Sequence, residues 1–191
     1  MIQRIVVASK NADKISEVEA VLEGLGVVGE VVRGLSWPDV DETGATLADN
    51  ALLKARAVLA ATGITALADD TGLEVVALGG APGVNTARFA GPDASYADNV
   101  EKMLRVMEDV TDRRAQFRTV VALAEPSGME WVAEGLVNGV ITSERRGGGG
   151  FGYDPVFEVA GVTLAEMGAG EKNEISHRAR ALRALAALLS D

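Results

Sequence analysis

Apolar positions in the first part of the chain alternate between strand and helix periodicity. Residues 4–8 form an apolar, β-branched run that is typical of a buried strand. From Ala12 onward, apolar side chains recur every three or four residues until two glycines supply a stop, so we expect a helix there. The same spacing predicts a second helix over 46–62, followed by a short strand over 64–68. Residues 73–78 are a further candidate strand.

The later part of the chain has a different pattern. We expect a helix over 96–110 and then two long strands, 115–124 and 129–141, joined by Pro-Ser-Gly as an antiparallel hairpin. Helical spacing returns over 174–190. The whole pattern predicts an α/β fold in which helices flank a mixed β-sheet. No repeat or linker divides the chain, so we expect a single domain over 1–191.

Composition and charge narrow the classes of function. The chain has 191 residues, of which 48% are hydrophobic and 24% charged, as in ordinary folded globular proteins. It carries 18 Lys and Arg against 28 Asp and Glu, a formal net charge of −10. Such an acidic surface repels phosphate backbones and anionic lipids, so we expect neither a nucleic-acid nor a membrane partner. An anionic small-molecule substrate would need a local cluster of donors, helped by a divalent cation.

Residue types exclude several kinds of site. The chain has no Cys and a single His, His177, which excludes disulfides, thiolate nucleophiles and metal sites built from several histidines. A Ser–His–Asp triad would have to use that residue. The longest apolar stretches are interrupted by glycine and polar residues, and the apolar run near the N-terminus is short and followed by charges. We therefore expect a cytoplasmic protein without a targeting segment.

The segment between the first expected strand and helix could bind phosphate. It places Ser9, Asn11 and Lys14 within one turn. A hydroxyl, an amide, an ammonium and the free N–H groups of a helix N-terminus suit a polyphosphate. The alternative is structural: Asn11 caps the helix and Lys14 is solvated. Spacing does not decide between the two.

Carboxylates gather at two places. Glu42 precedes the second expected helix, on which Asn50 and Lys54 stand one turn apart. Asp69 and Asp70 lie where a buried strand is expected to end. Adjacent carboxylates repel, so they need a cation such as Mg²⁺ or an arginine, unless this is an ordinary solvated turn. In a chain without Cys and with a single His, oxygen ligands favour Mg²⁺.

A glycine-rich segment follows the hairpin. Residues 147–152 match G-x-G-x-x-G, but Pro155 prevents a helix from opening there, so we do not expect a dinucleotide site. The segment could instead present the Phe151 ring and the Asp154 carboxylate to a base. The alternative is a mobile turn with Phe151 in the core.

The start of the last expected helix carries further polar candidates. Lys172 precedes it, and Ser176, His177 and Arg178 lie in its first turn. For a single histidine at such a position a packing or surface role is the ordinary expectation, and Arg178 would be a solvated charge. Spacing does not rank the remaining cationic candidates, which are Arg88, Arg118, Arg145 and Arg146.

Five ordered segments together resemble those of a known family. They are Ala8-Ser9-x-Asn11-x-x-Lys14, Glu42-Thr43-Gly44 with Asn50-Ala51-x-x-Lys54, Ala68-Asp69-Asp70-Thr71-Gly72, Gly150-Phe151-Gly152-Tyr153-Asp154-Pro155, and Glu171-Lys172-Asn173 with Ser176-His177-Arg178. In this order the chain resembles the inosine triphosphate pyrophosphatase family, of the Ham1 type, over essentially its whole length. Each motif alone is weak, whereas the ordered set is specific. The resemblance implies an elongated, two-lobed α/β fold with an active-site cleft between the lobes.

The resemblance also implies an activity. Such enzymes form homodimers and use Mg²⁺ to hydrolyse non-standard purine nucleoside triphosphates (ITP, dITP and XTP) to the monophosphate and pyrophosphate. Asp70 would be the general base, and Glu42, Asp70 and Asp69 would hold the metal. The substrate contacts would come from Ser9, Asn11 and Lys14 at the triphosphate, and otherwise from Thr71, Phe151, Gly152, Tyr153, Asp154, Lys172, His177 and Arg178.

The sequence leaves two alternative functions, another type of nucleotide pyrophosphatase and a protein that binds nucleotides without catalysis. A Maf-type pyrophosphatase would act on pyrimidine or modified nucleotides, but the motifs over 151–154 and 176–178 disfavour it. A catalytically silent nucleotide-binding protein is disfavoured because the carboxylates and lysines of the motifs are intact.

Overall fold

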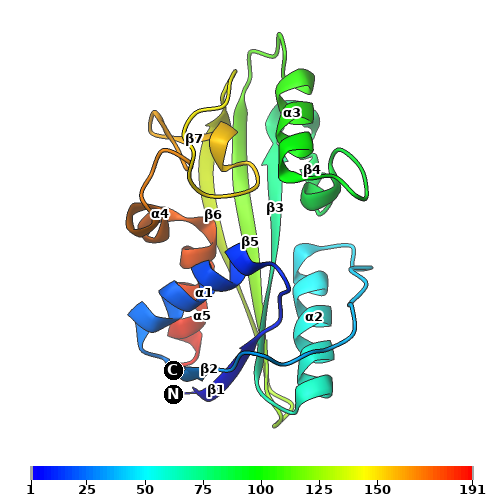
Figure 1. Ribbon diagram of the computed structural model, residues 1–191, viewed down its shortest axis with the longest axis vertical. Coiled ribbons are helices and arrows are strands. Elements are labelled where there is room, and N and C mark those ends of the chain that lie inside the picture. The colour runs from blue at the N-terminus through cyan, green and yellow to red at the C-terminus, as the bar shows by residue number, and fades with distance from the viewer. Residues whose placement is uncertain (1, 191) are drawn as a thin grey trace. The chain divides into compact units, whose positions relative to one another are not determined.

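The computed structural model describes residues 2–190, which fold into two compact units (Figure 1). The first unit contains residues 2–70, 119–135 and 177–190, and the second contains 71–118 and 136–176. The strands follow the order β2 (Val28–Val31), β1 (Ile2–Val7), β3 (Ala66–Val75), β5 (Arg114–Ala124), β6 (Glu130–Ile141), β7 (Phe157–Val159) and β8 (Val162–Thr163), and β4 (Pro82–Gly83) pairs with β3. Parallel pairs (β1 with β2 and β3) and antiparallel pairs (β6 with β7, β7 with β8) both occur, which confirms the predicted mixed α/β fold.

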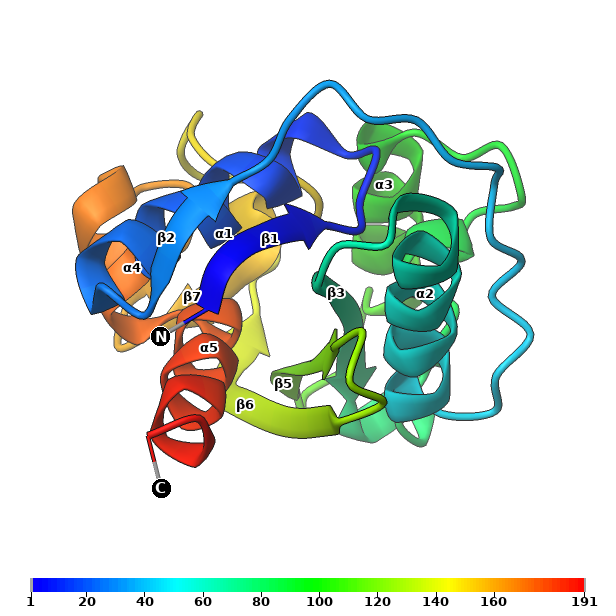
Figure 2. The same ribbon diagram turned by 90° about the horizontal axis from the view of Figure 1, so that it is seen from below.

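The first unit is built around parallel strands covered by helices on two sides. In Figure 2, α2 lies on one side of β1 and β3, and α1 and α5 lie on the other. β1 pairs with β2 through Ile2 and Val28, and with β3 through Val6 and Ala66. The elements of this unit are β1 (Ile2–Val7), α1 (Ala12–Leu25), β2 (Val28–Val31), α2 (Leu47–Thr62), the start of β3 (Ala66–Val75), parts of β5 (Arg114–Ala124) and β6 (Glu130–Ile141), and α5 (His177–Leu188).

The core of this unit follows from the helical spacing seen in the sequence. Val18 and Leu22 of α1 are buried on one face, where they pack with Ile5 and Leu67 of the strands and Leu182 of α5. Burying an aliphatic side chain of this size contributes about 1.5–3 kcal/mol. The unit's helices are therefore held to the sheet mainly by their apolar faces.

The second unit has its own core. Phe117 and Phe157 pack with ring centroids 4.6 Å apart, and Met103, Ile141 and Leu164 surround them. The elements of this unit are the end of β3, β4 (Pro82–Gly83), α3 (Tyr96–Val106), parts of β5 (Arg114–Ala124) and β6 (Glu130–Ile141), β7 (Phe157–Val159), β8 (Val162–Thr163) and α4 (Ala169–Ile175).

One expectation about the central strand is wrong. The sequence predicted a strand that ends at residue 68, just before the aspartates, and a separate candidate strand over 73–78, with a turn at the aspartates as one alternative. The structure instead has β3 as one strand from Ala66 to Val75. The chain stays extended because the two aspartates form hydrogen bonds with polar side chains on both faces of the strand. In addition, the Leu73 N–H donates to Thr86 Oγ1 at 2.8 Å.

Boundaries elsewhere also differ from the prediction. The helix expected over 174–190 starts at His177 as α5, because Ser176 takes an extended conformation (φ −62°, ψ 150°), and residues 174–175 end the preceding helix α4. The helix expected to reach 110 ends at Val106. The short strands β2, β4, β7 and β8 have two to four residues each, too few to show a period in the sequence. None of the helices between residues 2 and 190 combines the length and apolar character that crossing a bilayer requires.

Candidate active site

The two adjacent aspartates of β3 point to opposite faces of the strand. Asp69 Oδ2 accepts hydrogen bonds from Arg178 Nε at 3.2 Å and Nη2 at 3.1 Å, and lies 3.4 Å from Lys14 Nζ. Asp70 faces α2, where Asn50 Nδ2 lies 3.3 Å and Lys54 Nζ 3.1 Å from its oxygens. Successive side chains of a strand alternate in this way. The repulsion expected for neighbouring carboxylates is therefore relieved by separation and by cations on each side.

Lys54 joins two carboxylates on the α2 side of the strand. Its Nζ donates to Glu42 Oε1 at 2.7 Å and to Asp70 Oδ1 at 3.1 Å. Only 12% of the Lys54 side chain is exposed. A buried ammonium between two carboxylates satisfies charges that burial alone would make unfavourable. We call Glu42, Lys54 and Asp70 the carboxylate–lysine cluster.

The loop that carries Glu42 is held to α2 by Asn50. Asn50 Oδ1 accepts a hydrogen bond from the Gly44 N–H at 2.8 Å. A Cβ at Gly44 would lie 2.6 Å from that oxygen, so only glycine allows the approach. The helix itself begins with a capping box, in which the Thr46 and Asp49 side chains bond each other's backbone N–H. These contacts fix the loop and the helix start that support the cluster.

Burial and charge give the two aspartates different pKa values. Burial raises the pKa of Asp70, and the Glu42 carboxylate adds to this rise against the lowering effect of Lys54. Burial alone would also raise the pKa of Asp69, but the charges of Lys14 and Arg178 outweigh it and hold this pKa well below its usual range. Asp70 is therefore the stronger base of the two.

The start of α1 has the capping geometry that the structural alternative predicted. The Asn11 side chain accepts from the N–H groups of Asp13 at 3.0 Å and Lys14 at 3.2 Å, so Asn11 is the N-cap. Ser9 Oγ accepts from the Asn11 N–H at 3.1 Å. Lys14, however, is not simply solvated, since its ammonium lies beside Asp69. The phosphate contacts that the resemblance implies for Ser9, Asn11 and Lys14 stay a prediction.

His177 and Arg178, the first residues of α5, are both buried. The expectation of a solvated Arg178 is wrong, because its guanidinium forms ion pairs with Asp69 and with Glu17 of α1. The packing role expected for His177 agrees with its burial, and its Nδ1 lies 2.6 Å from Thr119 Oγ1 of β5. The first turn of α5 is therefore tied to α1, β3 and β5 by polar contacts.

In the second unit, the glycine-rich loop is fixed by Asp154. Asp154 Oδ2 accepts from Lys172 Nζ at 2.5 Å and from the Phe151 N–H at 2.8 Å, and the residues of this ion pair are 3% and 6% exposed. Gly150 has φ +66°, and a Cβ there would lie 2.1 Å from Asp154 Oδ2. The carboxylate expected to face a base therefore anchors the loop and Lys172.

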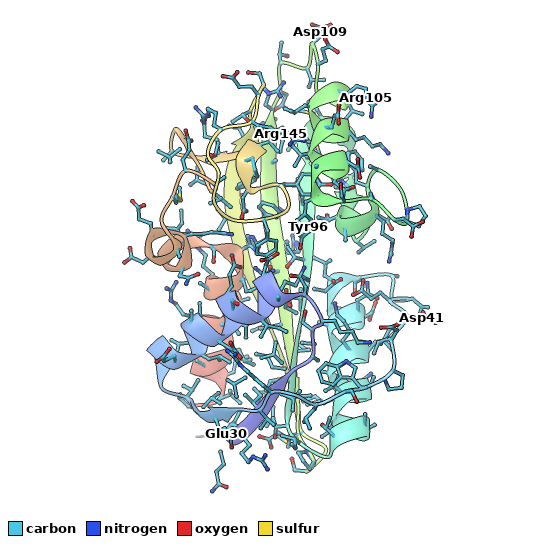
Figure 3. The ribbon with its side chains drawn as sticks, viewed as in Figure 1. Glu30, Asp41, Tyr96, Arg105, Asp109 and Arg145 are labelled. Carbon is cyan, nitrogen blue, oxygen red and sulfur yellow. The ribbon has the colours of Figure 1, made fainter. Side chains whose placement is uncertain are left out.

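Phe151 is half-buried and does not enter the core as the structural alternative proposed. The Lys172 ammonium lies 4.8 Å from its ring centroid, and the Tyr96 ring centroid lies 5.8 Å away. Figure 3 shows Tyr96 at the start of α3. A cation near an aromatic face is attracted to the ring. Together these contacts hold the Phe151 ring in a defined place.

The other predicted substrate contacts of the second unit lie in different settings. Tyr153 is buried, its hydroxyl donates to the Thr86 carbonyl at 3.0 Å, and burial raises its pKa. Gly152 has φ +63°, and Thr71 lies half-buried in β3. After the glycines the chain makes a short 3₁₀ turn at Asp154–Val156. A turn of this length does not provide the helix N-terminus that a dinucleotide site needs.

Comparison with known proteins decides the family. The model of the Ham1 family matches residues 5–188. This chain belongs to the Ham1 family. The match confirms the family that the ordered motifs indicated, and it covers both units of this Ham1 protein.

Similar proteins and structures agree with this assignment. A dITP/XTP pyrophosphatase of Staphylococcus epidermidis is 46% identical over 185 residues, 95% of this chain and 93% of the relative. One of Bacillus licheniformis is 44% identical over 98% of each chain. The structure of the Staphylococcus aureus Ham1 protein matches this one with a TM-score of 0.85 and 40% sequence identity over 98% of both chains. The structure of a Coxiella burnetii HAM1 protein matches with a TM-score of 0.83 and 39% sequence identity over 99% of both chains.

Several arginines of this Ham1 protein have structural partners that the sequence could not assign. Arg118 forms an ion pair with Glu74 at 3.2 Å, and Arg146 pairs with Glu158. Arg145, labelled in Figure 3, donates to the Ala97 carbonyl at 2.9 Å. These contacts lie within the second unit and tie its strands and loops together.

The sequence did not assign roles to four residues that the structure places beside predicted site residues of their own unit. Lys54 and Asn50 were recognised as neighbours on a helix and as part of one ordered motif, but without a role. Thr119 and Tyr96 gave no signal, because their partners are 58 and 55 positions away. Such contacts depend on how the strands and helices pack.

Two carboxylates of this Ham1 protein are candidates to hold a magnesium ion. Among the side chains of residues 2–190, no group of three or more His, Cys, Asp or Glu has a metal-binding arrangement. Glu42 and Asp70, however, converge on the same Lys54 ammonium. Mg²⁺ is usually held by one or two carboxylates together with substrate phosphates, so a pair of carboxylates suits it. Asp69 is the less suitable ligand, because Arg178 donates twice to its Oδ2.

Proposed function

We propose that this Ham1-family protein hydrolyses non-standard purine nucleoside triphosphates, namely ITP, dITP and XTP, to the monophosphate and pyrophosphate in a Mg²⁺-dependent reaction. The observation that carries the proposal is the buried carboxylate–lysine cluster, in which Asp70 has a raised pKa. The relatives named dITP/XTP pyrophosphatase, 46% and 44% identical over almost the whole chain, support the substrate class. Their names favour purine substrates over the pyrimidine substrates of a Maf-type enzyme.

The cations of the first unit would receive the triphosphate. The protein has a formal net charge of −10, so a polyanion needs a local positive site. Lys14 and Lys54 are partly buried at that site, where their charges are less screened than at the surface. Lys14, at the N-terminal end of α1, would stabilise the negative charge that develops on the departing pyrophosphate.

Asp70 would act as the general base. It accepts the proton of a water molecule while the water oxygen attacks the α-phosphorus and the bond to pyrophosphate breaks. Its raised pKa makes it a better proton acceptor than an exposed aspartate, whereas Asp69 is held ionised by Arg178 and Lys14. General-base assistance of this kind is typically worth ~10²–10⁴ in rate. The adjacent aspartates thus have different roles: Asp70 moves the proton, and Asp69 orders the cations.

Glu42 and Asp70 would hold Mg²⁺ together with phosphate oxygens of the substrate. When bound, the ion neutralises phosphate charge and lowers the pKa of a coordinated water. Asp69 is the third predicted ligand of this metal site. Lys54 balances the charge of the two carboxylates in the protein itself.

Base selectivity would come from hydrogen-bond donors and an aromatic face. Hypoxanthine and xanthine present a 6-oxo acceptor and an N1–H donor, whereas adenine presents the opposite pattern. His177 and Arg178 would provide donors toward the 6-oxo group, and Phe151, oriented by Asp154 and Lys172, would offer a stacking face. A site built for one pattern leaves buried groups unpaired with the other, which discriminates strongly.

Two further parts of the proposal rest on the family resemblance. We expect a homodimer and a cytoplasmic location. Light scattering coupled to size-exclusion chromatography would measure the mass in solution, and a monomer at micromolar concentration would contradict the dimer.

A pyrophosphate-release assay tests the proposed function. ITP, dITP and XTP are compared with GTP, ATP and pyrimidine triphosphates, each with Mg²⁺ and with a chelator. We expect release from the first three far above the others, and none after chelation. Equal rates on all purines would contradict the proposed selectivity. Preference for a pyrimidine triphosphate would favour the Maf-type alternative, and no release from any substrate would favour a silent binding protein.

A further inference from the structure

Thr119 is a polar side chain in the fully buried part of β5. It is 0% exposed, and the residues that follow it, from Val120 to Ala124, are buried and apolar. Its Oγ1 lies 2.6 Å from Nδ1 of His177. A buried hydroxyl is unfavourable unless it forms a hydrogen bond. Contact with the imidazole therefore explains why a threonine is stable among apolar residues here.

The backbone of His177 is held in place independently of this contact. His177 begins α5, and Gly135 of β6 lies directly under that first turn. A Cβ at Gly135 would lie 2.2 Å from the His177 carbonyl oxygen and 2.4 Å from the Ala181 nitrogen. Figure 2 shows α5 beside β6. The ring thus projects from a fixed backbone with Nδ1 toward Thr119, so a tautomer preference can be imposed on it.

We propose that Thr119 is a positioning residue that fixes the tautomer of His177. Its hydroxyl donates to Nδ1, which leaves the ring proton on Nε2. A neutral imidazole has a donor on one nitrogen and an acceptor on the other, and the partner of one nitrogen decides the state of the other.

On the basis of the function proposed above, this tautomer gives the site a preference for bases with a 6-oxo group over adenine. With the proton on Nε2, His177 can donate to the 6-oxo oxygen of hypoxanthine or xanthine. The 6-amino group of adenine is itself a donor and would face this N–H unfavourably. The opposite tautomer would reverse the preference. Thr119 therefore contributes to substrate selectivity without contacting the substrate.

The tautomer can be read directly by NMR, because the chain has one histidine. The protein, purified without a histidine tag, is labelled with ¹⁵N-histidine, and long-range proton–nitrogen correlations distinguish the protonated ring nitrogen from the unprotonated one. We expect the proton on Nε2 in the wild type and in Thr119→Ser, and on Nδ1 or exchanging between both in Thr119→Val. A wild-type proton on Nδ1, or an unchanged spectrum in Thr119→Val, would overturn the proposal.

Kinetics supply the second readout. We expect the ratio of kcat/KM for ITP over ATP to fall about tenfold in Thr119→Val, the effect of one lost hydrogen bond, and to recover in Thr119→Ser. Thermal unfolding of each variant shows whether the fold is intact. A ratio that stays at the wild-type value in folded Thr119→Val would also overturn the proposal. A wild-type protein that releases no pyrophosphate from ITP contradicts the proposed function instead, while the NMR result still decides the role of Thr119.

Discussion

The two units bury charge in different ways. In the first unit, Asp69 is shared by Arg178 and Lys14, and Arg178 also pairs with Glu17. In the second unit, the Asp154–Lys172 ion pair is buried beside the Phe151 ring. When one member of a shared network is removed, the remaining buried charge still has an opposite charge beside it. When one member of an isolated pair is removed, the remaining charge is buried without an opposite charge, which is strongly destabilising. We therefore expect the first unit to tolerate changes of charge, as the polyanion binding proposed for it requires, and the second unit to be the more rigid of the two.

The largest expected effect on stability comes from breaking the pair of the second unit. Lys172→Met leaves the Asp154 carboxylate buried without its ammonium, and we expect a loss of about 3–5 kcal/mol in the free energy of unfolding. Urea denaturation measures it. The matched control is the double variant Asp154→Leu with Lys172→Met, which should recover much of the loss. A single variant within 1 kcal/mol of wild type, on the order of a surface pair, would contradict the comparison.

A smaller loss is expected from the glycine that makes room for this pair. Gly150→Ala places a side chain in a left-handed conformation and against Asp154 Oδ2, and we expect a loss of about 2 kcal/mol. Gly148→Ala is the control, because nothing lies within 4 Å of a Cβ there and its φ is not in the left-handed region. Denaturation midpoints of the two variants decide the point. Equal midpoints would show that the loop adapts to the added side chain and that the second unit is less rigid than expected.

The N-cap of α1 tests the local support of the first unit. Asn11→Ala removes the acceptor for the N–H groups of Asp13 and Lys14, and should lower the free energy of unfolding by about 1 kcal/mol. Asn11→Asp retains an acceptor and should stay close to wild type. If both variants lose the same amount, the amide of Asn11 has a role other than capping.

The smallest expected effect is the loss of a cation from the shared network. Lys14→Met leaves Asp69 paired with Arg178, and 22% of the Lys14 side chain is exposed. We therefore expect a loss below about 1 kcal/mol. The same variant should lose activity, since Lys14 is proposed to meet the triphosphate. A loss as large as that of Lys172→Met would remove the distinction between the units.

Periodicity in the sequence predicted the long elements and missed local details. The apolar spacing of Val18 and Leu22 placed α1 correctly, and the hairpin of β5 and β6 followed from its two apolar runs. The sequence did not reveal that β3 continues through Asp69 and Asp70, because two adjacent aspartates before a glycine are also typical of a turn. Their partners, on α1, α2 and α5, become neighbours only in the folded chain.

The candidate site was predictable where motifs carry it. The carboxylates, Lys14 and the loop over 150–154 were found from ordered motifs. The motifs could not show the partners of these side chains: Asp154 binds Lys172, and Arg178 is buried instead of solvated. These contacts depend on burial and on distant partners, which a linear pattern does not contain.

We propose Asp70, and not its neighbour Asp69, as the general base. The measurement is the single-turnover rate of pyrophosphate release from ITP by Asp70→Asn and Asp69→Asn, with ITP binding measured separately by calorimetry. We predict that Asp70→Asn binds ITP but loses ~10²–10⁴ in rate, while folded Asp69→Asn loses far less of its chemical step. A near-normal rate in Asp70→Asn would show that Asp70 is not the base.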